Sequence, residues 1–473
     1  MANEDFLGLQ IMRTVLCSIL VLISGWVHAG DESFLRSYTT NQTSIIAGFI
    51  PDSSRIMVGE PLFLTFVVSN RVEKPFHFSF FGDSNFMITA TNAAGMPVRN
   101  RHPGWGGDGG GSSANVSKNK EYTERVLLNN WCGFDQPGEY TVTCRYSFRN
   151  YPMWGKFLSP PVVTVFKLTV LPTDAKRVTE IIEAWSHVVE TNGSLHEAAL
   201  ALAEINDPRT IPHLAVLVMK GPDINYIAVD ALARFTNSTA AADALTSALK
   251  GADESQPYVP QVASAALRKF HQCDRAAHML LPDLTNSDAN IRIQGAKAIS
   301  WTGSELAFTP LCSLLLDVSN SVRYAAARAI GRLGDSRSFG VLTNCLSSSD
   351  FELRIAAVNG LRVLTQSVEP LWVKPMILSG GENIRTYYDA IDLLQMYGGK
   401  QAAPGLASCL HFDDPSVRHS YNMRLILALE YSPNGPKYYY KWHCDLNRDG
   451  TDQELAENRQ ILSELKAWLE KYK

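Results

Sequence analysis

The chain has 473 residues, of which 45% are hydrophobic and 19% are charged, and its formal net charge is −4. A chain of this length and composition holds enough apolar material for two or three packed domains, which excludes disordered and collagen-like proteins. Because proteins that neutralise phosphates carry an excess of basic residues, the slightly acidic balance argues against nucleic acid as the partner.

The N-terminal segment is typical of an export signal. Arg13 precedes an apolar run that begins at Val15, and Ala29 is a small residue suited to cleavage. An uncleaved membrane anchor is the alternative, but the apolar run ends by Val27 and is short for a bilayer. We therefore expect residues 1–29 to be a signal peptide, and the mature protein to be secreted or periplasmic without a membrane span.

Residues 30–172 show the two-residue periodicity of β-strands. About seven short apolar alternations are separated by turn residues, which predicts an antiparallel β-sandwich. The clearest alternation places five side chains on one face, namely Tyr140, Val142, Cys144, Tyr146 and Phe148. The segment from Asp135 to Val142 resembles the tyrosine corner of immunoglobulin-like and fibronectin-like sandwiches. The resemblance implies that the Tyr140 hydroxyl donates a hydrogen bond to the loop before it.

Four aromatic residues lie in predicted loops of this sandwich: Trp105, Trp131, Tyr151 and Trp154. Clustered aromatic rings stack on sugars or on partner side chains, and this favours glycan recognition. Burial of the same rings as loop anchors is an equally good interpretation.

Residues 173–435 change to helical periodicity and repeat. A hydrophobic residue followed by arginine recurs at regular intervals, with successive arginines 31, 31, 31 and 33 residues apart: Arg292, Arg323, Arg354, Arg385 and Arg418. A small–apolar pair such as Ala329-Ile330 follows seven residues after the hydrophobic position. A fixed period with two helices per unit predicts an α-α superhelix of about seven to eight repeats, as in HEAT and armadillo solenoids.

The unit from Ser321 to Asp335 resembles the bacterial HEAT repeat of the phycobilin-lyase-like group. The segment from Asn206 to Leu214 resembles the turn and second helix of the same repeat. The resemblance implies a bacterial protein in which an immunoglobulin-like sandwich precedes a HEAT solenoid. It does not imply lyase activity, because fold alone does not determine function.

The recurring arginines have two interpretations. They form an anion-binding stripe, or they form a structural ladder that pairs with carboxylates such as Asp288, Asp317 and Asp350. We favour the ladder, because stacked repeats of small residues need a polar contact that fixes their register.

One motif suggests a metal-dependent enzyme. His196-Glu197 resembles the His-Glu motif with which HEAT-type deoxyhypusine hydroxylase holds its di-iron site. Such a site needs several His-Glu pairs from different repeats, and arginines occupy the equivalent positions here. We therefore expect no enzymatic activity, and interpret His196-Glu197 as the polar first turn of a helix.

Residues 436–473 predict an Asp-rich loop followed by a capping helix. The loop matches several positions of an EF-hand-type calcium site: Asp445, Asn447, Asp449, Thr451 and Asp452. Position twelve of that pattern should be acidic and is Ala456, so a polar turn that caps the helix is the alternative. Calcium is the one cofactor that the sequence suggests.

Together these features favour an exported, non-enzymatic scaffold that binds a protein partner on the solenoid. Glycan binding by the sandwich is the alternative function, and a metal-dependent hydroxylase or a lyase-like HEAT protein is a remote one.

Overall fold

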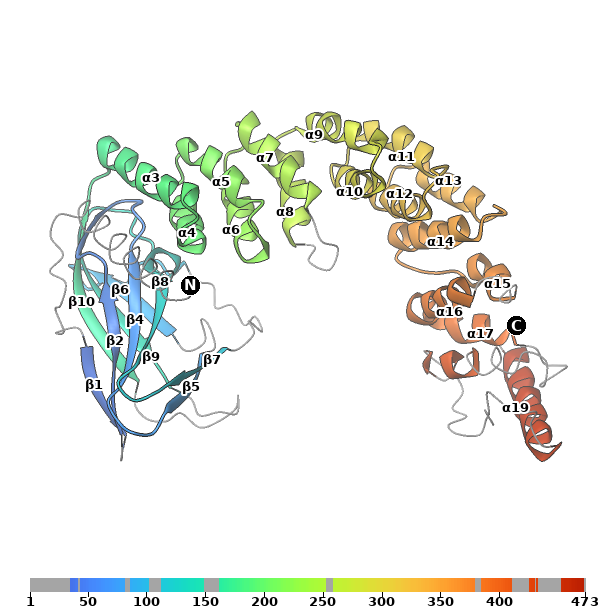
Figure 1. Cartoon of the computed structure of the whole chain (residues 1–473), viewed down its shortest axis with the longest axis horizontal. Helices are drawn as coiled ribbons and strands as arrows, with labels where there is room; N and C mark the ends of the chain where they lie inside the picture. Colours follow the sequence, from blue (N-terminus) through green and yellow to red (C-terminus); the bar gives the residue numbers. More distant parts are fainter. Residues whose placement is uncertain are drawn as a thin grey trace, which may run out of the picture. The chain divides into compact units, whose positions relative to one another are not determined.

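The computed structural model describes residues 35–40, 43–80, 86–101, 112–148, 161–251, 258–378, 384–410, 425–429, 431–432 and 452–471. The chain divides into two compact units, Met1–Phe235 and Thr236–Lys473. The described strands and helices α3 to α6 belong to the first unit, and the later helices belong to the second (Figure 1). Strands give way to helices at the expected boundary near residue 172, but the first helices share a compact unit with the sandwich.

Two four-stranded sheets form the sandwich. The first has the order β1-β2-β4-β8 and is antiparallel throughout: β1 (Leu35–Thr40), β2 (Thr43–Pro51), β4 (Phe63–Asn70) and β8 (Glu121–Leu127). The second has the order β3-β10-β9-β6, in which only β3 pairs in parallel: β3 (Arg55–Met57), β10 (Val162–Leu171), β9 (Gly138–Tyr146) and β6 (Phe86–Asn92). A separate ribbon joins β5 (Phe76–Phe80) to β7 (Ser112–Val116).

The core between the sheets is apolar and rich in aromatic residues. The five side chains expected on one face, from Tyr140 to Phe148, are all buried in it. The Tyr140 hydroxyl donates a hydrogen bond of 2.7 Å to the backbone oxygen of Gln136, the contact expected from the resemblance to a tyrosine corner.

Nearly all residues of strand β4 are buried, on both faces of the strand, whereas a strand at the surface of a sandwich alternates buried and exposed residues. Phe63, which the alternation places on the outer face, packs against Trp185 of α3 (Ala175–Glu190) with ring centroids 5.6 Å apart. A helix therefore covers the face that an isolated sandwich would expose to water, and the sequence periodicity gave no sign of this cover.

The remaining helices of the first unit follow the HEAT pattern of a short helix and a longer one. They are α4 (Leu195–Ile205), α5 (Ile211–Leu217) and α6 (Pro222–Leu232). Asp207 accepts hydrogen bonds from the backbone and side chain of Arg209 at the turn before α5. This local pair fixes the start of the short helix, and Asp335 and Arg337 repeat it before α13.

The second unit continues the repeats. Its helices are α7 (Thr239–Lys250), α8 (Tyr258–Lys269), α9 (Cys273–Leu280), α10 (Ala289–Ser300), α11 (Phe308–Leu314), α12 (Asn320–Leu333), α13 (Ser338–Cys345), α14 (Phe351–Thr365), α15 (Pro370–Leu378), α16 (Ile384–Tyr397) and α17 (Ala402–Ala407). The expected arginines lie in the first turn of α10, α12, α14 and α16, and the paired small and apolar residues are fully buried. The solenoid fold is therefore confirmed.

Small residues let neighbouring helices approach closely. A Cβ added to Gly331 on α12 would overlap the backbone of Gly360 on α14, and one added to Gly360 would overlap the carbonyl oxygen of Ala327. At this crossing no residue larger than glycine fits without a backbone shift.

The C-terminal helix α19 (Asp452–Glu470) packs on the last described repeat, as expected. Ile461, Leu462 and Leu465 are buried in a cluster with residues of α16 and α17, and Trp468 and Leu469 pack against its edge. None of the described helices combines the length and the apolar content needed to cross a bilayer.

Candidate functional site

The structure gives the arginine row a clear structural role at two positions. Arg292 and Asp317 form a bidentate pair, with Nε to Oδ2 at 2.8 Å and Nη2 to Oδ1 at 2.9 Å. Asp317 also accepts a hydrogen bond from the backbone N–H of Ser319, just before α12. The pKa of the Asp317 carboxyl lies below its ordinary value, first because Arg292 donates hydrogen bonds to it. The arginine of one repeat therefore binds the carboxylate that lies just before the long helix of the next repeat.

Arg323 repeats this contact one unit later. Its Nη2 lies 2.7 Å from Oδ2 of Asp350, and its Nη1 donates to the backbone oxygen of Asp317 at 2.7 Å. Asp288, the third expected carboxylate, instead caps α10 by accepting from the N–H of Asn290.

Arg354 differs from the first two arginines. Its Nη1 donates to the backbone oxygen of Ser348 at 2.6 Å, and its guanidinium lies 3.9 Å from the centroid of the Phe351 ring. An aromatic face and a carbonyl thus replace the carboxylate. The side chain of Arg385 and the whole of Arg418 lie outside the described residues. The guanidinium groups of the three described ladder arginines all contact other groups of the protein.

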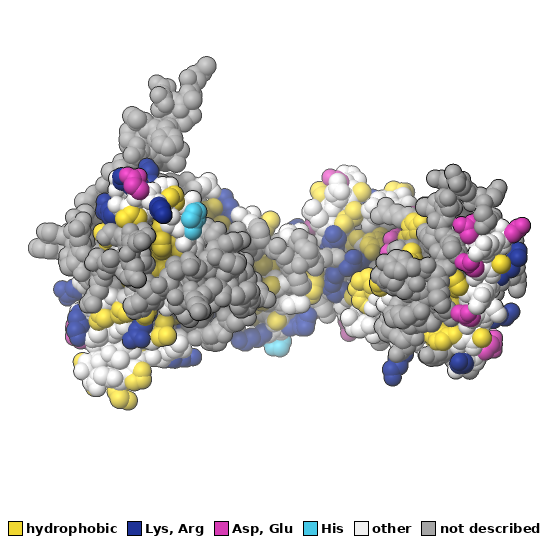
Figure 2. Space-filling view, turned by 90° about the horizontal axis from the view of Figure 1, so that it is seen from below, with side chains coloured by type: hydrophobic (Ala, Val, Ile, Leu, Met, Phe, Trp, Pro, Cys, Tyr) yellow, Lys and Arg dark blue, Asp and Glu magenta, His cyan; other side chains and the backbone are white. Residues whose placement is uncertain are grey.

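An open groove lies on the long helices instead. Side chains of α10, α12, α14 and α16 line a volume of about 670 Å³. The apolar lining includes Ile293 and Leu393, together with Met396, which is 69% exposed. Figure 2 shows hydrophobic side chains among acidic and basic ones on the visible surface of the second unit.

The groove carries charges of both signs. Lys297 and Arg328 come from α10 and α12, whereas Glu352, Asp389 and Asp392 come from α14 and α16. Basic and acidic side chains therefore occupy different helices along one groove.

The His-Glu motif has a structural partner in the sandwich. The Nε of Arg125 on β8 lies 3.3 Å from Oε2 of Glu197, and the Ser194 hydroxyl donates to the same carboxylate at 3.1 Å. His196 is exposed. Glu197 therefore joins the first solenoid helices to the sandwich. No group of three or more His, Cys, Asp or Glu suited to a metal occurs within the described part of the chain.

The four loop aromatics do not form a described site. Trp131 is only 7% exposed and belongs to the sandwich core, which agrees with the loop-anchor interpretation of its ring and not with contact to a ligand. Trp105, Tyr151 and Trp154 lie outside the described residues.

The calcium loop is described only at its end. Asp452 is the exposed first residue of α19, and Asp445, Asn447, Asp449 and Thr451 lie outside the described residues. The six described cysteines are all unpaired.

Two family models match parts of the solenoid. The model for HEAT repeats matches residues 310–369, and the model for the PBS lyase HEAT-like repeat matches residues 195–217. Both matches fall on helices that the structure places in the repeats. No curated protein is significantly similar in sequence to this chain.

Several solved structures are similar to this chain at low sequence identity. The complex of CpcE and CpcF of phycocyanin lyase from Nostoc is 19% identical, covering 53% of this chain and 94% of that one, with a TM-score of 0.25. Human deoxyhypusine hydroxylase is 16% identical, covering 47% and 89%, with a TM-score of 0.21. Kap121p bound to Pho4p is 10% identical, covering 62% and 37%, with a TM-score of 0.35.

The groove was not predicted from the sequence. Its residues lie on four helices more than a hundred residues apart at the extremes, and none belongs to the repeated arginine positions. The signal was present only as polar and apolar residues three and four positions apart on each long helix, such as Tyr324 and Arg328.

Proposed function

We propose that this chain is an exported, non-enzymatic scaffold that binds a protein segment in the groove on α10, α12, α14 and α16. The groove itself carries the proposal. It is open, it spans four consecutive repeats, and it combines apolar side chains, of which Met396 is exposed, with charges of both signs. HEAT-repeat solenoids generally use such extended surfaces to bind other proteins.

The absence of enzymatic activity is part of the proposal and has separate support. Of the motif that suggested a metal enzyme, the carboxylate of Glu197 binds Arg125 and Ser194. Export is supported by the apolar run after Arg13 and by Ala29. N-terminal sequencing of extracellular or periplasmic protein should find Gly30 first, and an intact N-terminus on cytoplasmic protein would contradict export.

The groove is tested with a matched pair of variants. Met396→Glu places a charge on the exposed apolar lining, and Phe339→Glu places the same charge on an exposed apolar residue of α13, outside the groove. The full chain and both variants are immobilised and exposed to the secreted and periplasmic fractions, and bound proteins are identified by mass spectrometry.

We expect at least one protein to bind the parent and Phe339→Glu but to be lost with Met396→Glu. If the parent and both variants capture the same proteins equally, or if the parent captures none, the groove is not the binding site. Glycan binding remains the alternative, and an array probed with the full chain would reveal it as sugar-dependent signal that Met396→Glu leaves intact.

A further inference from the structure

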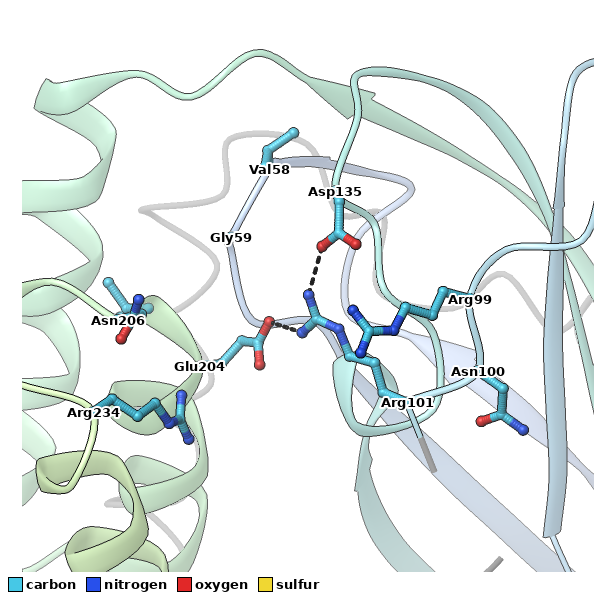
Figure 3. A pocket seen from close by; sticks show the side chains of 10 residues that line it. Val58, Gly59, Arg99, Asn100, Arg101, Asp135, Glu204, Asn206 and Arg234 are labelled. Carbon is cyan, nitrogen blue, oxygen red and sulfur yellow. Dashed lines mark hydrogen bonds and ion pairs between the residues drawn. The ribbon is translucent and has the colours of Figure 1, made fainter. Parts of the chain in front are cut away.

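A second cavity lies within the first unit, between the sandwich and its helices. It has a volume of about 780 Å³ and is lined by the turn after β3, by residues 99–101, by Asp135 and by the C-terminal ends of α4 and α6 (Figure 3). It shares no residue with the groove of the proposed function.

The walls of this cavity are fixed by hydrogen bonds. The backbone N–H of Arg101 donates to the oxygen of Trp131 at 3.0 Å, and the N–H of Gly133 donates to the oxygen of Arg99 at 3.0 Å. On the helical side, Nη1 of Arg234 donates to the backbone oxygen of Ala203 at 2.8 Å. The side chains on both walls therefore project from ordered backbone.

A single arginine, Arg101, forms ion pairs with both carboxylates of the cavity. Arg101 lies 2.7 Å from Oε1 of Glu204 through Nη1 and 2.7 Å from Oδ1 of Asp135 through Nη2. Figure 3 shows this Arg101–Glu204 bridge in the centre of the cavity, with Arg99 and Arg234 on either side of it.

The positive charges of Arg99 and Arg234 are therefore available to bind a ligand. Both side chains are exposed, and neither forms an ion pair with a carboxylate among the described residues. The five charged groups sum to +1, with three arginines against Asp135 and Glu204. Surface cations without an anionic partner are ordinary, but here two of them line one cavity from opposite walls, where two anionic groups of one ligand would meet them.

The chemistry of the ligand follows from these charges. A guanidinium binds a carboxylate through two parallel hydrogen bonds. A phosphate dianion concentrates its two charges at one point close to Asp135 and Glu204, whereas a peptide with two carboxylates brings one charge to each arginine. The amide side chains of Asn100 and Asn206 also line the cavity and suit the peptide groups of a chain.

We infer that this cavity binds an acidic peptide segment, with one carboxylate on Arg99 and another on Arg234. The volume exceeds that of a single small anion and suits several residues of an extended segment.

The test uses the full chain and fluorescein-labelled hexaglutamate, followed by fluorescence anisotropy at low salt. Hexaglutamine carrying the same label is the matched uncharged probe. The variants are Arg99→Gln and Arg234→Gln, and the control is Arg55→Gln, an exposed arginine on β3 that does not line the cavity. Melting curves verify that each variant folds. If Arg234→Gln does not fold, the result for Arg99→Gln alone tests the inference.

We expect hexaglutamate to bind and hexaglutamine not to bind. Each cavity variant should raise the dissociation constant about tenfold, because each removes one charge-assisted contact, and Arg55→Gln should leave it unchanged. Equal weakening by Arg55→Gln, or binding of hexaglutamine, would overturn the inference. Displacement of the probe by inorganic phosphate at equal affinity would also overturn it, in favour of a simple anion site. Met396→Glu should not affect this probe, so failure here and failure of the solenoid groove are distinguishable.

Discussion

Arg323 of α12 reaches Asp350, the residue that caps the following long helix α14. Nη2 of Arg323 lies 2.7 Å from Oδ2 of Asp350, while Oδ1 of Asp350 accepts hydrogen bonds from the N–H groups of Glu352 and Leu353. The Asp350 carboxylate therefore caps the N-terminus of α14 and also binds Arg323 on α12. Asp350 thus links two neighbouring repeats.

Removal of that arginine should destabilise the second unit. The Arg323 side chain is 13% exposed, and its loss leaves the oxygen of Asp317 and the carboxylate of Asp350 without their partner. We expect Arg323→Ala to lower the free energy of unfolding by about 1–3 kcal/mol. Arg459→Ala, at an exposed position of α19, makes the same chemical change and should be neutral. A parent-like melt of Arg323→Ala combined with loss of a protein partner would show that the row binds ligands.

The close approach of α12 and α14 gives a second prediction. Gly360→Ala should destabilise the second unit by about 1–3 kcal/mol, because the new methyl group overlaps the carbonyl oxygen of Ala327. Gly340→Ala on α13 is the control, since a Cβ there meets no atom within 4 Å. Chemical denaturation should find that control unchanged or slightly more stable, owing to the better helix propensity of alanine. Equal stability of the two variants would contradict the tight crossing.

The Asp335–Arg337 pair predicts a pH dependence. Hydrogen bonds from the side chain and backbone of Arg337 lower the pKa of Asp335 from 3.8 to about 2. Because the folded state favours the ionised carboxylate, the pair stabilises the protein above the ordinary pKa, and this stability is lost as pH falls through about 2. Asp335→Asn should therefore melt a few degrees below the parent at pH 7. This difference in melting temperature should become smaller between pH 4 and pH 2. Glu369 is exposed, and Glu369→Gln should melt at the same temperature as the parent at pH 7. A difference for Asp335→Asn that is independent of pH would refute the ionic origin.

The Asp-rich loop gives a prediction about calcium. If Asp445, Asn447 and Asp449 hold the ion, calcium stabilises the helix that begins at Asp452 by mass action, about 2.7 kcal/mol at a hundredfold excess over the dissociation constant. Chelator should lower the melting temperature, and Asp449→Ala should abolish that difference. Identical melts with calcium and chelator would leave the loop as a polar turn, while the apolar face of α19 would still cap the repeats.

Much of the fold could be predicted from the sequence, because its signals are local and periodic. Alternation from Tyr140 to Phe148 determined which side chains of β9 and its extension are buried, and the spacing of Arg292, Arg323 and Arg354 placed the starts of three long helices. Each depends on a residue's own strand or helix, whose geometry repeats every two or 3.6 residues.

Only the tertiary structure decided the contacts between distant segments. It buried Phe63 against Trp185, paired Glu197 with Arg125, and brought Arg99 and Arg234 to one cavity. These contacts join elements separated by 72 to 135 positions, and no local period encodes which surface of a helix meets which edge of a sandwich. The sequence by itself therefore determined the repeats and their interior, whereas packing between the elements decided which charged groups are committed to structure and which remain open to a ligand.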